Sequence, residues 1–224
     1  MEIWQQNTIW FEDLPNDIFA QIHYKENKAS INLLSNNSYV ILWNYNVKNK
    51  NLINLPENNK LKYLELNLSN CESFEGISNF KTIKRLELHY CSKLASDIGI
   101  SSISNTIEWL HINMSKKFVL TSELEKLKKL KVLCLNNCGS IDNLNFLNSL
   151  PDLVDFRFVN TNIKSGDLNP ILEHKKLTNA GFLNKKHYNY KAETIEEILK
   201  KRKPDLRVPI NKGEYKSFSY NVFE

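Results

Sequence analysis

A short pattern of apolar residues recurs along this chain at a nearly constant interval. Apolar residues fill the first, fourth and sixth places of the pattern, and the starts lie 21 to 24 residues apart. The seven starts are Val40, Leu61, Ile83, Ile107, Leu130, Leu153 and Leu177. Self-similarity at such a period predicts stacked units, each of which buries its apolar side against its neighbours. The repeat therefore favours an elongated solenoid.

Two further features describe one unit of the repeat. Apolar residues spaced by three precede the strand positions, as at Ile77, Phe80 and Ile83, which predicts a short helix or 3-10 turn there. Small residues that can hydrogen-bond fill the ninth place of the five central units: Ser69, Cys91, Ser115, Cys138 and Thr161. Such side chains can satisfy backbone groups at a bend. We expect an α/β solenoid with a parallel sheet on its concave side and the short helices or 3-10 turns on its convex side.

The two ends of the chain do not follow the repeat, and we expect them to form caps. The pattern divides the chain into an N-terminal cap (1–39), repeats (40–185) and a C-terminal cap (186–224). In the first cap the pattern predicts a helix over 11–22, then a hairpin joining 30–34 to 39–47. In the last cap a capping box that starts at Thr194 predicts a helix, followed by strands near 206–208 and 215–223.

The segment Leu130–Cys138, with the sequence LKVLCLNNC, closely follows the pattern LxxLxLxx(N/C)xL. On these residues the chain resembles the leucine-rich repeat family over about 40–185, and its short units are similar to the bacterial, internalin-like classes. The resemblance implies that the concave face binds another protein. Side chains at the third, fifth, seventh and eighth places of each unit are expected to point out from that face.

We expect a partner-binding patch on this face, with large apolar groups at its centre and charged groups around them. The candidate residues are Tyr63, Glu65, Arg85, Glu87, His89, Tyr90, Trp109, His111, Met114, Asp155 and Arg157. The alternative is that the terminal tail of the chain folds across the groove and buries the aromatic side chains.

Glu87, His111 and Cys134 occupy the same place in successive units and imitate a Cys/His/acid arrangement. Because a concave sheet supplies neither an oxyanion site nor a closed pocket in any obvious way, we expect no catalytic residues, no metal site and no cofactor. The net charge is only +5, and 26 of the 30 basic residues are Lys, so nucleic acid is not the expected partner. Neither a membrane span nor a secretion signal is evident, and a monomer in the cytoplasm, apart from its partner, is expected.

Among functions, the resemblance favours a protein-binding module without enzymatic activity. A short cytoplasmic repeat protein with unusual caps is similar to the bacterial immunity proteins of contact-dependent inhibition and polymorphic toxin systems, which implies a toxin domain as partner. The stretch Leu14–Phe19 also resembles the start of an F-box, which would make the chain a substrate-reading adaptor. A phosphatase-regulatory scaffold of the short-repeat type is the third hypothesis.

Overall fold

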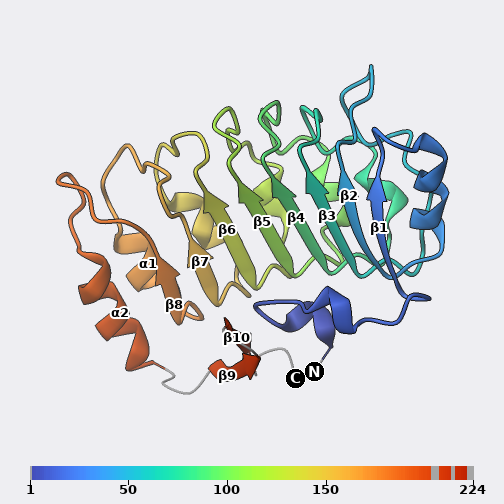
Figure 1. The fold of residues 1–224 in the computed structure, drawn as a ribbon. Coiled ribbons are helices and arrows are strands. Elements are labelled where there is room, and N and C mark those ends of the chain that lie inside the picture. The colour runs from blue at the N-terminus through green and yellow to red at the C-terminus, as the bar shows by residue number, and fades with distance from the viewer. Residues whose placement is uncertain (1, 203–206, 213–214, 221–224) are drawn as a thin grey trace.

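The computed structural model describes residues 2–202, 207–212 and 215–220, and its main element is one parallel sheet. Within these residues eight strands pair in the order in which they follow one another along the chain, from β1 (blue) to β8 (orange) in Figure 1. The strands are β1 (Phe19–His23), β2 (Tyr39–Trp43), β3 (Tyr63–Asn67), β4 (Arg85–His89), β5 (Trp109–Asn113), β6 (Val132–Asn136), β7 (Asp155–Arg157) and β8 (Asn179–Gly181). This topology confirms the predicted solenoid with a parallel sheet.

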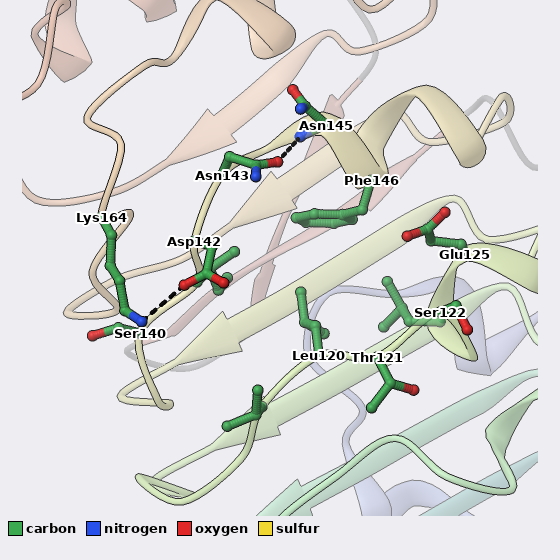
Figure 2. A pocket seen from close by; sticks show the side chains of 13 residues that line it. Leu120, Thr121, Ser122, Glu125, Ser140, Asp142, Asn143, Asn145, Phe146 and Lys164 are labelled. Carbon is green, nitrogen blue, oxygen red and sulfur yellow. Dashed lines mark hydrogen bonds and ion pairs between the residues drawn. The ribbon is translucent and has the colours of Figure 1, made fainter.

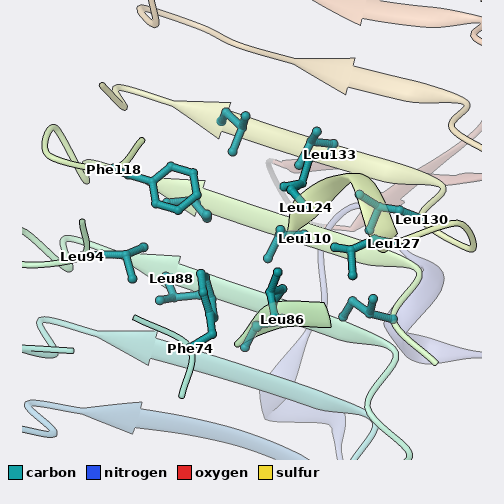
Figure 3. Close-up of a cluster of buried hydrophobic side chains, with 14 of the residues drawn as sticks. Phe74, Leu86, Leu88, Leu94, Leu110, Phe118, Leu124, Leu127, Leu130 and Leu133 are labelled. Atoms are coloured by element: carbon teal, nitrogen blue, oxygen red, sulfur yellow. The ribbon is translucent and has the colours of Figure 1, made fainter. Parts of the chain in front are cut away.

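The register of the strands places the repeat positions in rows. Leu64 of β3 pairs with Leu86 of β4, which pairs with Leu110 of β5 and then with Leu133 of β6. These four side chains are fully buried in the main core, which Figure 3 shows between the strands and the short helices. Each stacked unit therefore buries its apolar side against the next.

The predicted role of the ninth-place residues is confirmed. Each of these small side chains donates a hydrogen bond to a backbone carbonyl of the preceding unit. Ser69 Oγ donates to the Tyr45 carbonyl at 2.9 Å, and Thr161 Oγ1 donates to that of Leu135 at 2.6 Å. The bends after the strands are therefore tied together from one unit to the next.

Short 3-10 helices lie on the other side of the units, as the spacing by three predicts. They are η4 (Ile77–Asn79), η5 (Ile100–Ile103), η6 (Leu124–Lys126) and η7 (Asn145–Ser149), and neighbouring ones contact each other. The C-terminal part of the chain adds α1 (Asn169–Glu173) and α2 (Ala192–Lys200). Strands β9 (Arg207–Lys212) and β10 (Tyr215–Tyr220) pair antiparallel.

The helix expected over 11–22 and the hairpin expected after it are wrong. The chain forms the 3-10 helix η2 (Phe11–Asp13) and then β1, which adds a parallel strand before the first predicted one. The hairpin segment 30–34 lies in the 3-10 helix η3 (Lys28–Ser35). Parallel pairing with β2 buries Ala20 and Ile22 of β1, and this tertiary contact outweighs local helix preference.

Two smaller expectations also need correction. In β2 it is Val40 and Leu42 that pair with Leu64 and Leu66, so the first unit begins three residues earlier than the pattern placed it. Helix α2 begins before the proposed capping box, with Lys191 as its N-cap residue and the Ala192 amide bonded to Asn184 Oδ1 at 2.7 Å. The side-chain oxygen of Asn184, in the loop before the helix, therefore accepts from the first turn of α2 in place of the predicted cap residue Thr194.

Candidate concave-face binding site

The N-terminal residues 2–14, which we call the strap, lie across the concave face of the sheet. The strap includes the 3-10 helix η1 (Ile3–Gln5) and is the dark-blue segment that runs back beneath the strands in Figure 1. Arg85, at the start of β4, donates hydrogen bonds to three strap carbonyls: Trp4 at 3.0 Å, Asn7 at 3.3 Å, and Gln6. These bonds contact only backbone atoms of the strap.

Apolar contacts fix one end of the strap. Trp4 and Ile9 are buried in one cluster with Tyr39, Ile41 and Tyr63 of β2 and β3. The Phe11 ring lies 5.3 Å from that of Tyr63. Farther along the sheet, Arg157 Nη1 of β7 donates to Asn7 Oδ1 at 3.2 Å. The strap is thus held at positions between β2 and β7.

Arg85 also organises the aromatic side chains beneath the strap. Its guanidinium carbon lies 3.8 Å from the centroid of the Trp109 ring and 5.5 Å from that of Tyr63. A guanidinium within about 6 Å of an aromatic face gains a cation–π attraction. The aromatic centre predicted from the sequence is therefore present, but one arginine and the strap enclose it.

The candidate residues divide into a covered group and an open group. Tyr63, Arg85, Glu87, Trp109 and Asp155 are at most 5 % exposed, so the expectation that they face solvent is wrong. Glu65, His89, His111, Met114 and Arg157 are half-buried, and Tyr90 is 54 % exposed. The strap and the mutual pairing of charges cause the burial. The expectation that the C-terminal tail supplies a cover concerns residues 203–224, whose side chains lie outside the described part.

Glu87 is the centre of a buried charge network on β4 and β5. Its Oε1 accepts from Arg85 Nε at 2.6 Å, while its Oε2 lies 2.8 Å from His89 Nε2 and 3.5 Å from His111 Nδ1. Burial alone would raise the pKa of Glu87, but the Arg85 charge and the two histidine contacts outweigh it and hold that pKa well below its usual range. Burial likewise opposes charge on His89, yet the bond to Glu87 raises the pKa of His89.

The same residues form the one His/Glu cluster with metal-ligand spacing in the described part of the chain, with ligand atoms within 4.8 Å of one another. Asn136 Oδ1 accepts from the Val159 amide at 2.9 Å, so its Nδ2 is the atom 3.2 Å from His111 Nε2. His111 Nε2 must then accept, and the ring proton lies on Nδ1, toward Glu87. A metal ion at His111 Nδ1 would have to replace that proton, and its positive charge would lie near the guanidinium of Arg85. The arrangement therefore favours a hydrogen-bonded network over a metal site.

The expected row of Glu87, His111 and Cys134 is in register across β4, β5 and β6. Cys134 is 2 % exposed, and burial raises the pKa of its thiol to about 12. Since the thiolate is the nucleophile in cysteine chemistry, this thiol is poorly suited to attack a substrate. The row is a consequence of stacking, and it packs Cys134 against Trp109 and Val132.

Beyond the ends of the strands, one residue per unit has a left-handed backbone. The φ angles are 55° at Leu68, 56° at Tyr90 and 57° at Met114. Leu68 is 46 % exposed and was not among the predicted site residues. The signal that could have found it is its place in the repeat, the eighth, which Tyr90 and Met114 share. The open part of the concave face thus continues onto this row of turns.

A hollow of about 590 Å³ lies away from the concave face, beside η6 and η7. Figure 2 shows its lining of polar and apolar side chains, with Asp142 bonded to Lys164 on one side and Phe146 and Glu125 on the other. The Asp142–Lys164 pair is exposed to solvent and has a distance of 2.8 Å. It is an open surface feature without the charged network found on the concave side.

The fold and the repeat pattern define a leucine-rich repeat solenoid with an occupied concave face. Among solved structures, internalin C2 of Listeria monocytogenes is similar, with 19 % identity over 68 % of this chain and 74 % of that one, at a TM-score of 0.42. Internalin F of the same organism shows 15 % identity over 70 % and 59 % of the two chains, at a TM-score of 0.33. No protein-family model and no curated protein matches the sequence. In the described residues no helix has the length and apolarity needed to span a bilayer.

Proposed function

We propose that this solenoid is a protein-recognition module that works by binding and without catalysis. The observation that carries the proposal is that the concave face already binds a polypeptide segment, its own strap. Arg85 recognises the carbonyls of Trp4, Gln6 and Asn7, and the aromatic side chains of β2 and β3 receive apolar groups. Contacts to backbone carbonyls are independent of sequence, so a partner segment can use the same chemistry.

The open part of the face gives such a partner further contacts. Glu65, His111 and Arg157 are half-buried and lie in a row across β3, β5 and β7. Tyr90 adds a large exposed aromatic side chain at the end of β4. An exposed aromatic side chain beside half-buried charged side chains is typical of a protein-binding patch. The partner either lies beside the strap or displaces it.

Within this class we propose an immunity protein that acts in the cytoplasm and blocks a bacterial toxin domain. Steric blocking needs a rigid surface and slow dissociation, and the parallel sheet with its tied bends supplies the rigid surface. The F-box-like stretch Leu14–Phe19 forms the turn into β1, and three of its apolar side chains pack against the buried cluster that contains Trp4, Ile9 and Tyr63. We therefore assign that stretch to the fold.

The test is co-expression with the polypeptide that is encoded directly upstream of this gene, followed by calorimetry of the purified pair. We expect growth to be rescued, and we expect the double variant Tyr90→Ala, His111→Ala to weaken binding by about 2 kcal/mol or more. The exposed Ile53, in the loop after β2 and outside the face, provides the matched control as Ile53→Ala. Failure to bind or neutralise that polypeptide would contradict the immunity role, and loss of binding in the control alone would contradict the site.

A further inference from the structure

Three neighbouring units place large apolar side chains where the backbone is left-handed. We call Leu68, Tyr90 and Met114 the turn ridge. A left-handed conformation is unfavourable for L-residues, and asparagine tolerates it better than bulky side chains do. The flanking units follow that rule, because Asn44, Asn137 and Asn160 fill the same position with φ between 51° and 57°.

The backbone around these residues gives no reason for the apolar side chains. The amide of Leu68 donates to the His89 carbonyl at 3.0 Å, and the amide of Tyr90 donates to that of Asn113 at 3.0 Å. Asn44 makes the equivalent bond at 2.8 Å, so asparagine satisfies the same ladder. The fold does not require apolar side chains at these strained positions. Their presence therefore points to a function of the exposed side chains themselves.

The turn ridge is also not part of the hydrophobic core. Leu68 is 46 % and Tyr90 54 % exposed, and with Met114 they line an open groove of about 430 Å³. Successive units set their turns about 4.8 Å apart, so the three side chains form one continuous apolar strip. An exposed apolar strip of this kind marks an interaction surface.

The rim of the groove is basic. Lys116 and Lys117 line it directly, and Lys93 is exposed on the turn between them and Leu68. The acidic side chains on these turns are fewer than the lysines. Glu72 pairs with Lys50 at 2.7 Å and also feels the charges of Lys93 and Lys117, Glu75 accepts from Ser73 Oγ at 3.1 Å, and Asp97 is buried. The local charge therefore complements an acidic partner.

We propose that the turn ridge docks an acidic polypeptide segment that carries apolar side chains, and this rests on the protein-recognition function proposed above. The apolar side chains of the segment fill the groove between Leu68, Tyr90 and Met114, while its carboxylates meet the lysines. A nucleic acid fits less well, because the aliphatic Leu68 and Met114 offer no stacking surface and the described turns supply lysine without the arginine fork.

The test measures fluorescence anisotropy of labelled probes on the full chain. The probes are a peptide that mixes Asp and Glu with Leu and Phe, an acidic peptide with Ser in place of the apolar residues, a basic peptide with the same apolar residues, oligo-dT, and phosphatidylserine vesicles. The ridge variant Leu68→Asn, Tyr90→Asn, Met114→Asn copies the flanking units and is expected to fold. Ile53→Asn and Leu183→Asn are controls at equally exposed apolar positions elsewhere.

We expect the acidic apolar peptide to bind at least about tenfold more tightly than the other probes, and the ridge variant to lose about tenfold or more of that affinity. The controls should be unchanged. Absence of binding, or a ridge variant that binds like the wild type, would overturn the proposal. Tighter binding of oligo-dT, the basic peptide or vesicles would overturn the choice of occupant. Binding lost in His111→Ala but kept in the ridge variant would move the site to the concave face and leave protein recognition intact.

Discussion

The guanidinium of Arg85 donates a hydrogen bond of 3.0 Å to the backbone carbonyl of Trp4, which lies 81 positions earlier in the chain. The same side chain pairs with Glu87 and covers the face of Trp109. One residue therefore joins the strap, the buried charge network and the aromatic centre of the concave face.

Replacing Arg85 should destabilise both the sheet and the strap. Arg85→Ala leaves the carboxylate of Glu87 buried without its strongest partner and leaves three strap carbonyls without a donor, so we expect a loss of about 3 kcal/mol. Urea denaturation measures this change. Lys50→Ala, at an exposed ion pair with Glu72, is the control and should change stability by less than about 1 kcal/mol. Equal effects of the two substitutions would show that Arg85 is not the junction.

Stability should depend on pH through Glu87 and His89. The raised pKa of His89 means that the folded state holds its proton more tightly, so this contribution is present below 6.5 and is lost as pH rises through the raised value. The lowered pKa of Glu87 means that its contribution is present above 4.5 and is lost as pH falls through the lowered value.

We therefore expect these two groups to contribute most between pH 4.5 and 6.5, measured as the free energy of unfolding across pH. His89→Gln should flatten the decline above pH 6.5, because it removes the proton that is lost there. A decline of unchanged steepness in His89→Gln would assign the pH dependence to other groups.

Gly76 should tolerate no side chain. Its φ is +94°, and an added Cβ would lie 2.2 Å from the backbone nitrogen of Ile53 in the preceding unit. Gly76→Ala must strain the turn and push two units apart, and we expect a loss of about 2 kcal/mol or more in thermal denaturation. Gly181→Ala is the control, since its Cβ would meet only the Arg157 side chain at 3.4 Å. Similar melting of both variants would contradict the stacking shown here.

Tyr90 should lower the stability of the folded protein. Tyr90→Asn relieves a bulky residue in the left-handed region, and we expect it to raise the stability by about 0.5–1 kcal/mol. Chemical denaturation of the single variant measures this gain. Asn137→Tyr, at the same place in a flanking unit, should show the opposite sign. A destabilising Tyr90→Asn would mean that the ring contributes to folding.

The repeat pattern predicted the strands well because the same place in every unit is buried and therefore needs an apolar residue. Leu64, Leu86 and Leu110 recur at one place since every unit buries the same side. The first unit was misplaced because Trp43 and Tyr45 also satisfy an apolar pattern. The true first place holds Asn37, a buried polar residue bonded to the Leu33 carbonyl at 2.8 Å.

The cover of the concave face could not be predicted in the same way. The strap has no repeat, and Arg85 binds its carbonyls, which every residue type possesses. Only the three-dimensional path of the chain brings Asn7 to Arg157. The turn ridge could be predicted in part, because its residues share a place in the repeat. The left-handed backbone there could not, because it depends on hydrogen bonds between neighbouring units.

Hydroxyl-radical footprinting of the full chain tests the covered concave face most directly. Oxidation of each side chain is quantified by mass spectrometry of its peptide. We predict rapid modification of Tyr90 and Met114 and strong protection of Tyr63 and Trp109, with protection of both lost in Arg85→Ala. Modification of Tyr63 and Trp109 in the wild type at the rate of Tyr90 would contradict the account.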